Sequence, residues 1–292
     1  MKVIIESGAT KADWTLIQDS QVKQFQTAGL NFASGDEEFV FRTLEEATVK
    51  VLDITDAEVP EEINLYAAGL FPSEDPESTY QKLKKALSTR FPGAQVDLEN
   101  DLMAAARALF GNKPGIACIL GTGSNSCVYD GKSILRKMSS GGFILGDEGS
   151  GSALGRAFIS DIIKGLVPEC VALAFKEKYD LEYTTVVKNV YRGASPAAYL
   201  GQFAPDILAF YDKDHYMRNL VDANFRAFFK RCILRINQDG AGEGKQLPVG
   251  IVGGFAYACK DILTSIANEE GVRIDKILKS PSQELINYHQ NL

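Results

Sequence analysis

Two short apolar segments in this chain are each followed by a turn of small hydrogen-bonding residues and then by a second apolar segment. The first unit comprises Val3–Ile5, the turn Glu6–Lys11 and Trp14–Ile17, and the second comprises Ile116–Leu120, the turn Gly121–Asn125 and Cys127–Tyr129. Glycine lets a backbone approach an anion closely, with amides and hydroxyls directed at it. Two such units, each heading one half of the chain, predict two lobes that close on one polyphosphate.

Length and charge limit the classes of protein to which this chain can belong. Its 292 residues are enough for two domains of ordinary size. No apolar run approaches the roughly 20 residues of a membrane helix, and the apolar stretch at the N-terminus is too short for a signal peptide. The net charge of −7 argues against a nucleic-acid partner, because such binding depends on phosphate neutralisation. We therefore expect no membrane and no nucleic acid as partners.

The five cysteines are well spread, and no two of them form a Cys-x-x-Cys pair. This spacing predicts neither a disulfide framework nor a zinc or iron-sulfur site. A reducing cytoplasm is the simplest compartment for such a chain, so we expect a cytoplasmic protein.

Hydrophobic periodicity predicts an α/β protein. In the first part we expect strands at about 2–6, 13–18, 21–27, 63–68 and 95–99, and helices near 37–52, 77–90 and 102–110. Beyond the breaker cluster Gly111–Gly115 we expect strands at 116–120, 127–129, 248–252 and 273–278, mostly helix over 152–238, a helix over 255–268, and a polar tail. The predicted domains are an N-terminal lobe, 1–112, and a C-terminal lobe, 113–292.

The composition of the first turn fits phosphate binding, although an ordinary hairpin turn is the alternative. Gly8 permits close backbone approach, Thr10 supplies a hydroxyl and Lys11 a positive charge. Glu6, at the end of a buried strand, is a candidate to hold magnesium through water. The second turn, Gly121–Asn125, is the stronger phosphate candidate, because five small or polar residues directly after five apolar ones are hard to explain as core packing.

Asp101 is the candidate general base. Aspartate and asparagine are common helix N-caps, so a purely structural role is the alternative. Asn100 can serve as that cap, which leaves Asp101 in the first turn of the helix, where its carboxylate could accept a proton from a substrate hydroxyl.

Two glycine-rich segments remain. Leu145–Gly151 places Asp147 and Glu148 between glycines; this fits a polar substrate loop, whereas acidic residues before a helix also favour its dipole. Gly253-Gly254 follows a predicted strand, and either makes a simple turn or lets an adenine or ribose lie against the backbone.

Together these segments resemble the BadF/BadG/BcrA/BcrD-type ATPases, and within them the N-acetylglucosamine kinase-like proteins of the actin-like superfamily. The similarity covers nearly the whole chain. It rests on six segments in order: Ser7–Trp14, Thr27–Asn31, Glu99–Asp101, Gly115–Asn125, Leu145–Gly151 and Val252–Gly254. The resemblance implies two ribonuclease-H-like lobes with a cleft between them.

The resemblance also implies roles for individual residues. ATP would meet Gly8, Thr10, Lys11, Gly121, Thr122, Gly123, Gly253, Gly254 and Ala258. The sugar pocket would be formed by Asn31, Asp101, Ser124, Asn125, Ser140, Gly141, Gly142 and Asp147. The cofactors implied are ATP and Mg²⁺, and related kinases imply a homodimer.

The expected activity is ATP-dependent phosphorylation of an amino sugar, N-acetylglucosamine first, at its 6-hydroxyl, with Asp101 as the base. Glu6 stands where the family usually has aspartate. This departure motivates an alternative, a nucleotide- or sugar-binding sensor with weakened catalysis. A third hypothesis is an ATPase that acts on a protein partner.

Overall fold

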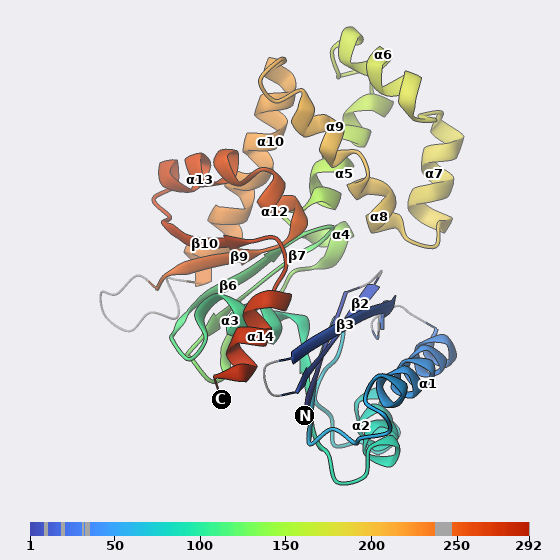
Figure 1. Ribbon diagram of the computed structural model, residues 1–292. Coiled ribbons are helices and arrows are strands. Elements are labelled where there is room, and N and C mark those ends of the chain that lie inside the picture. Colours follow the sequence, from blue (N-terminus) through green and yellow to red (C-terminus); the bar gives the residue numbers. More distant parts are fainter. Residues whose placement is uncertain (9–10, 19–20, 31, 33–35, 237–246, 292) are drawn as a thin grey trace. The chain divides into compact units, whose positions relative to one another are not determined.

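The computed structural model describes residues 1–8, 11–18, 21–30, 32, 36–236 and 247–291 (Figure 1). It divides into two units, one formed by Met1–Gly111 with Pro281–Leu292 and the other by Asn112–Ser280. The first boundary lies one residue from the one expected from the sequence. The C-terminal segment differs, because it belongs to the N-terminal unit and not to a lobe spanning 113–292.

The N-terminal unit contains a five-stranded mixed sheet. Its strands are β1 (Lys2–Ser7), β2 (Lys11–Gln18), β3 (Gln21–Ala28), β4 (Glu62–Ala67) and β5 (Gln95–Asn100), in the order β3-β2-β1-β4-β5. The first three strands pair antiparallel, whereas β4 and β5 run parallel to β1.

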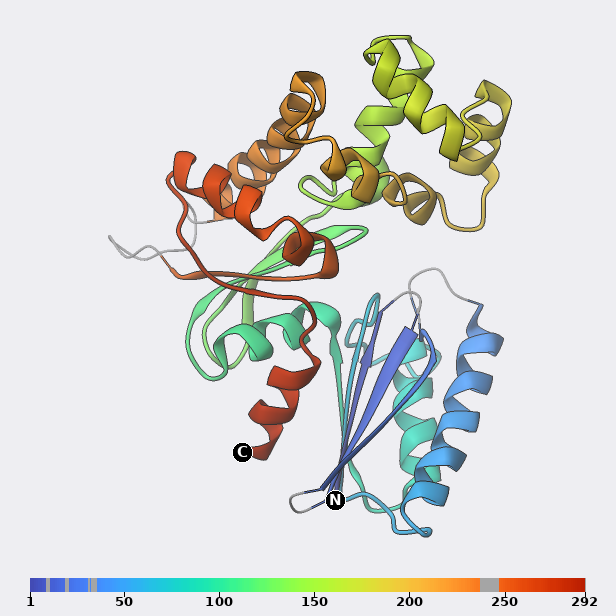
Figure 2. The same cartoon turned by 45° about the horizontal axis from the view of Figure 1, so that its top comes forward.

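Helices cover both faces of this sheet (Figure 2). On one face lie α1 (Glu37–Ile54) and α2 (Thr79–Arg90); on the other lie α3 (Asp101–Phe110) and α14 (Ser282–Gln290). Successive side chains of a strand point to opposite faces. Val3 and Ile5 join the core with α1 and α2, so Ile4 and Glu6 point toward the face that α3 and α14 cover.

The C-terminal unit repeats the same strand topology. Its strands are β6 (Gly115–Leu120), β7 (Ser124–Tyr129), β8 (Ile134–Met138), β9 (Val249–Val252) and β10 (Ile274–Leu278), in the order β10-β9-β6-β7-β8. Again the first three pair antiparallel and the last two run parallel to the first. The predicted α/β class with two ribonuclease-H-like units is therefore confirmed.

Most helices of the C-terminal unit come from the long insertion between β8 and β9. They are α4 (Gly142–Leu145), α5 (Gly151–Ile163), α6 (Glu169–Lys178), α7 (Tyr183–Arg192), α8 (Pro196–Gly201), α9 (Ala204–Ala209) and α10 (His215–Phe228), which continues into the π-helical turn η1 (Phe229–Ile233). Their buried aromatic side chains, Phe158, Phe175, Phe203 and Phe225 among them, share one core with β6. Within the described ranges, no helix has the length and apolarity to cross a membrane.

Three local expectations differ from the structure. The helix expected over 255–268 is two helices, α12 (Gly254–Ala258) and α13 (Lys260–Glu269), because the backbone of Cys259 leaves the helical conformation (φ −115°, ψ 26°). Strand β8 was not expected. The polar tail contains α14, whose Leu285 and Ile286 are buried.

Candidate active site

Four of the residues predicted to meet ATP line one cavity in the C-terminal unit. The cavity has a volume of about 400 Å³ and is lined by Gly121 and Thr122 from the β6–β7 turn and by Gly254 and Ala258 from α12. The remaining wall was not predicted and consists of Gly151, Gly201, Ala204, Pro205, Leu208 and Phe255. Volumes from about 300 Å³ upward are typical of small-molecule sites.

The β6–β7 turn is fixed to the start of α5 by backbone hydrogen bonds. Gly151 N–H donates to the Gly121 carbonyl at 2.9 Å, and Ser152 N–H donates to the Thr122 carbonyl at 3.0 Å. Ser150 caps the helix, with its hydroxyl accepting from Ala153 N–H at 3.1 Å. The turn therefore lies beside a helix N-terminus, whose dipole favours an anion.

Gly253 is required by the close approach of two strands. Its φ is +148°, and a Cβ atom there would lie 2.1 Å from the Leu120 carbonyl oxygen. Its N–H donates to the Leu278 carbonyl at 2.9 Å. This packing brings the end of β9, and with it Gly254, next to the Gly121–Gly123 turn that follows β6.

Asp147 lies against the same turn. Its Oδ1 accepts from Ser124 N–H at 3.3 Å, and a Cβ atom at Gly123 would lie 3.0 Å from its Oδ2. The side chain is buried and the backbone is left-handed (φ 56°), an uncommon conformation for aspartate that often marks functional sites. Burial raises the pKa of Asp147, and Glu148 adds to the rise, whereas the Ser124 amide and Arg156 oppose it.

The segment Ser140–Asp147, predicted to contact sugar, forms a loop whose two ends are hydrogen-bonded to each other. The Ser140 carbonyl accepts from Asp147 N–H at 2.9 Å, Gly141 is left-handed, and α4 begins at Gly142. Asn125 lies on β7, with its side-chain oxygen accepting from Ser126 N–H at 3.0 Å. The structure thus brings Gly123, Ser124 and Ser140 close to Asp147.

Two residues that the sequence did not single out support this loop. Arg156 of α5 donates through Nη1 to the carbonyls of Phe143 and Ile144, at 2.6 and 2.5 Å. Asn224 of α10 accepts from Gly149 N–H and donates to the Ser150 carbonyl. Both lie within amphipathic helices, where such side chains carry no distinctive sequence signal.

The first turn is described only in part. Gly8 N–H donates to the Lys11 carbonyl at 3.0 Å, which closes the hairpin between β1 and β2. The Lys11 ammonium pairs with Asp13 at 2.9 Å. Thr10 and Asn31, predicted to meet phosphate and sugar, lie outside the described residues.

Asp101 occupies the position expected from the sequence. Asn100 is the N-cap of α3 and its side chain accepts from Met103 N–H at 2.9 Å, so Asp101 is the first helical residue and remains partly exposed. Glu6 is half-buried near it. Burial, together with the charges of Asp13 and Asp101, raises the pKa of Glu6 to about 7, against the lowering effect of Lys11.

This acidic group suits a cation bound through water. No three acidic, histidine or cysteine side chains of the described residues come close enough to hold a metal directly. Mg²⁺ in phosphoryl-transfer sites keeps several waters and needs only one or two carboxylates besides the substrate phosphates. Glu6, with the charges of Asp13 and Asp101 nearby, fits that requirement.

Two other cavities contain none of the predicted site residues. One of about 730 Å³ lies between α1 and α2, and one of about 560 Å³ is lined by α4, α5, α7 and α8. Both exceed the cavity at Gly121 in volume, so volume alone does not identify the site; the small, hydrogen-bonded turns do.

The chain matches no family model and no curated protein. Among solved structures, it is similar to a "Putative N-acetylglucosamine Kinase" from Porphyromonas gingivalis, with 35% identity, a TM-score of 0.86, and coverage of 100% of this chain and 99% of that one. A protein of the same description from Chromobacterium violaceum has 17% identity and a TM-score of 0.73, with 98% of each chain covered.

A third similar structure is the ROK hexokinase from Thermus thermophilus, at 17% identity and a TM-score of 0.59, covering 95% of this chain and 92% of that one. The last two likenesses concern the fold alone. The similarity to the Porphyromonas protein extends over both chains at an identity that indicates common family membership. The chain therefore belongs to the N-acetylglucosamine kinase-like family of actin-like ATPases.

Proposed function

We propose that the protein is an ATP-dependent sugar kinase that phosphorylates N-acetylglucosamine, or a closely related amino sugar, at its 6-hydroxyl. The observation that carries the proposal is the cavity formed jointly by Gly121, Thr122, Gly254 and Ala258. These residues come from two segments more than a hundred positions apart, and both were assigned to ATP from the sequence. The descriptions of the similar proteins support the same substrate class.

In the proposed reaction, Asp101 accepts the proton of the sugar hydroxyl as that oxygen attacks the γ-phosphorus. The new oxygen–phosphorus bond forms as the bond from the γ-phosphorus to the β,γ-bridging oxygen breaks, and ADP leaves. The turn Gly121–Gly123 and the N-terminus of α5 offset the negative charge of the phosphates. Bound Mg²⁺, oriented by Glu6, would neutralise part of that charge.

Sugar recognition is assigned to the loop around Asp147. A buried carboxylate can accept hydrogen bonds from sugar hydroxyls. A ligand without such a hydroxyl would leave the carboxylate of Asp147 unpaired, and its binding would therefore be disfavoured. Ser124, Asn125 and the Ser140–Gly142 segment would supply further polar contacts, and Asn31 one from the N-terminal unit. The cleft and the homodimer expected from the resemblance stay predictions.

One observation, the half-buried glutamate at position 6, favours a second function, that of a nucleotide- and sugar-binding sensor with weakened catalysis. Burial raises the pKa of this carboxylate to about 7 in the metal-free protein, which opposes the ionised form that Mg²⁺ attracts. A sensor that binds nucleotide and sugar but turns over slowly would have this property. Glu6→Asp separates the two: a sensor gains activity from the shorter side chain, whereas an efficient kinase with Glu6 in place does not.

The proposal is tested with purified protein, ATP, Mg²⁺ and a panel of amino sugars and neutral hexoses. We expect ADP release that depends on an amino sugar and is fastest with N-acetylglucosamine. No sugar-dependent ADP release across the panel, from protein shown to be folded by circular dichroism, would refute a kinase of this class.

A further inference from the structure

Helix α7 carries an apolar stripe that the fold leaves largely uncovered. Tyr183, Val186, Val187, Val190 and Tyr191 follow the spacing of one helix face. Only Val186 is buried, whereas Tyr183 and Tyr191 are 64% and 80% exposed. An amphipathic helix normally buries such a stripe, and an apolar patch that stays exposed is typical of a binding surface.

The stripe of α7 forms one wall of the cavity of about 560 Å³ in the C-terminal unit. Helix α8 packs on both α5 and α7, and the three helices lie together in Figure 1. The rest of the apolar lining comes from these neighbours and α4, through Phe143, Ile144, Ile159, Ile163, Pro196 and Leu200. Small-molecule sites have volumes of about 300–1,000 Å³, so the cavity has the size and the apolar lining of such a site.

Arg156 of α5 is the one charged side chain in the described lining of this cavity. It is half-buried, and its Nη1 uses both hydrogens on the carbonyls of Phe143 and Ile144, at 2.6 and 2.5 Å. Within the described ranges, Nε and Nη2 of Arg156 have no hydrogen-bond partner and its guanidinium has no ion-pair partner. Their N–H groups lie side by side on one edge of the guanidinium, and that edge matches the two oxygens of a carboxylate.

We propose that this cavity is a second ligand site, which binds an organic carboxylate with an apolar body. The carboxylate pairs with Nε and Nη2 of Arg156, and the apolar body covers the stripe of α7. An uncharged apolar molecule would leave the half-buried guanidinium unpaired, and a small anion would leave the stripe exposed. The inference goes beyond the proposed kinase activity, because the cavity shares no lining residue with the one at Gly121.

The test measures the binding of 2-naphthylacetate to the full-length protein by ligand-observed NMR. Its uncharged isostere, 2-naphthylacetamide, and acetate are measured in the same way. We expect the naphthyl acid to bind at roughly submillimolar concentration and the amide about tenfold or more weakly, since one charge-assisted contact is lost. Acetate is expected to show no measurable binding.

Two variants locate the probe in the cavity. Arg156→Gln should bring the ratio of the acid and amide affinities close to one, and its binding of the amide shows whether the cavity is intact. If amide binding is lost, Val187→Glu decides: its new carboxylate repels the acid and competes for Arg156, so it should weaken the acid more than the amide. The matched control is Leu173→Glu, at an exposed leucine of α6 outside the lining, which should change neither affinity.

Equal affinity of the wild type for acid and amide, or an unchanged ratio in the variants, overturns the inference. Failure of both naphthyl probes to bind overturns it as well. If Val187→Glu then converts a dimer into monomers in sedimentation, a second copy of the chain covers the stripe instead. None of these measurements depends on sugar phosphorylation, so a protein without kinase activity refutes the proposed function and leaves this site to be judged by binding.

Discussion

Glu6 combines a half-buried position with two neighbouring carboxylates, so its ionisation opposes folding. Burial and Asp13 raise its pKa from the ordinary 4.5 to about 7. Between these values the folded state binds more protons than the unfolded state, and the free energy of unfolding therefore falls as pH rises. Over pH 5 to 8 the loss from this one group amounts to at most about 3 kcal/mol.

Glu6→Gln should remove this pH dependence. We expect the variant to unfold at higher urea concentration than the wild type at pH 8, and at a similar concentration at pH 5. Urea titrations at the two pH values check this, with a substitution of the exposed Glu46, Glu46→Gln, as the control. If the free energy of unfolding of Glu6→Gln still falls between pH 5 and pH 8 as much as that of the wild type, Glu6 is not the group responsible.

The adjacent glycines 253 and 254 should respond differently to the same methyl group. At Gly253 the Cβ atom would lie 2.1 Å from a backbone oxygen, so Gly253→Ala is expected to lower the free energy of unfolding by about 2–4 kcal/mol. At Gly254, which lines the cavity, the methyl group meets no described atom within 4 Å.

Gly254→Ala should therefore retain stability, since alanine is the better helix residue, and weaken ADP binding about tenfold or more by entering the cavity. Thermal unfolding and calorimetry of both variants make the comparison. Equal ADP affinity in Gly254→Ala and the wild type would argue against nucleotide in this cavity.

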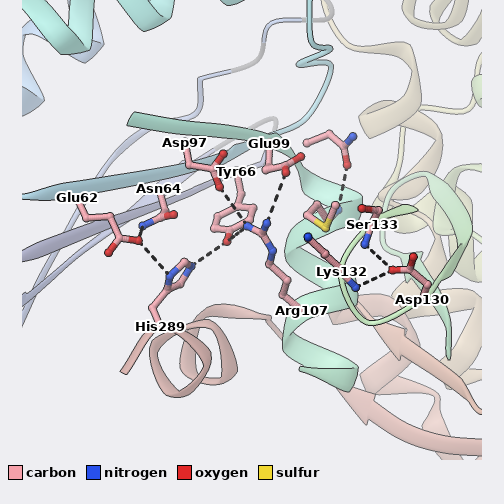
Figure 3. A network of polar contacts seen from close by, with 12 residues as sticks. Glu62, Asn64, Tyr66, Asp97, Glu99, Arg107, Asp130, Lys132, Ser133 and His289 are labelled. Atoms are coloured by element: carbon pink, nitrogen blue, oxygen red, sulfur yellow. Dashed lines mark hydrogen bonds and ion pairs between the residues drawn. The ribbon is translucent and has the colours of Figure 1, made fainter. Parts of the chain in front are cut away.

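At the scale of elements, α14 depends on the buried polar network of Arg107, Tyr66 and His289, which fixes its carboxyl end (Figure 3). Tyr66→Phe removes the hydroxyl between Arg107 and His289 and leaves two buried nitrogens without that partner. We expect a loss of about 2–4 kcal/mol in the free energy of unfolding, measured by urea denaturation. The control is Tyr183→Phe, at an exposed tyrosine. If Tyr66→Phe lowers the free energy of unfolding no more than this control does, the network contributes little to stability.

The elements also show what the sequence could and could not predict. The strands that carry the two turns, and Asn100 as the cap that leaves Asp101 in the first turn, follow from local patterns and are confirmed. Helix α14 was missed because its three buried residues, Leu285, Ile286 and His289, lie in a mostly polar segment and gain burial only from tertiary packing.

The same reason explains the incomplete prediction of the cavity. Gly201, Ala204 and Leu208 carry no chemistry of their own, and α8 and α9 reach the β6–β7 turn only through the packing of the inserted helices. Gly155 allows α5 and α8 to pack closely and so helps to place this part of the cavity wall, because a Cβ atom at Gly155 would lie 1.8 Å from the Leu200 carbonyl oxygen. Such long-range contacts leave no pattern in a single sequence.

At the scale of the whole molecule, the two units repeat one strand topology but divide the proposed work. The N-terminal unit carries the candidate base Asp101 and the half-buried Glu6, and the C-terminal unit carries the cavity proposed to bind nucleotide and the Asp147 loop. The helices that follow the last strand of each sheet, α3 and α14, both belong to the N-terminal unit. The chain thus passes between the units twice, at Gly111–Asn112 and at Ser280–Pro281.

The most direct test of the account is the mass of the sugar after incubation of N-acetylglucosamine with ATP, Mg²⁺ and the protein. We expect the wild type to add one phosphate to the sugar, and Asp101→Asn to form the same product roughly 10²–10⁴-fold more slowly, because it lacks the general base. Unmodified sugar in the presence of accumulating ADP, or full-rate phosphorylation by Asp101→Asn, would contradict it.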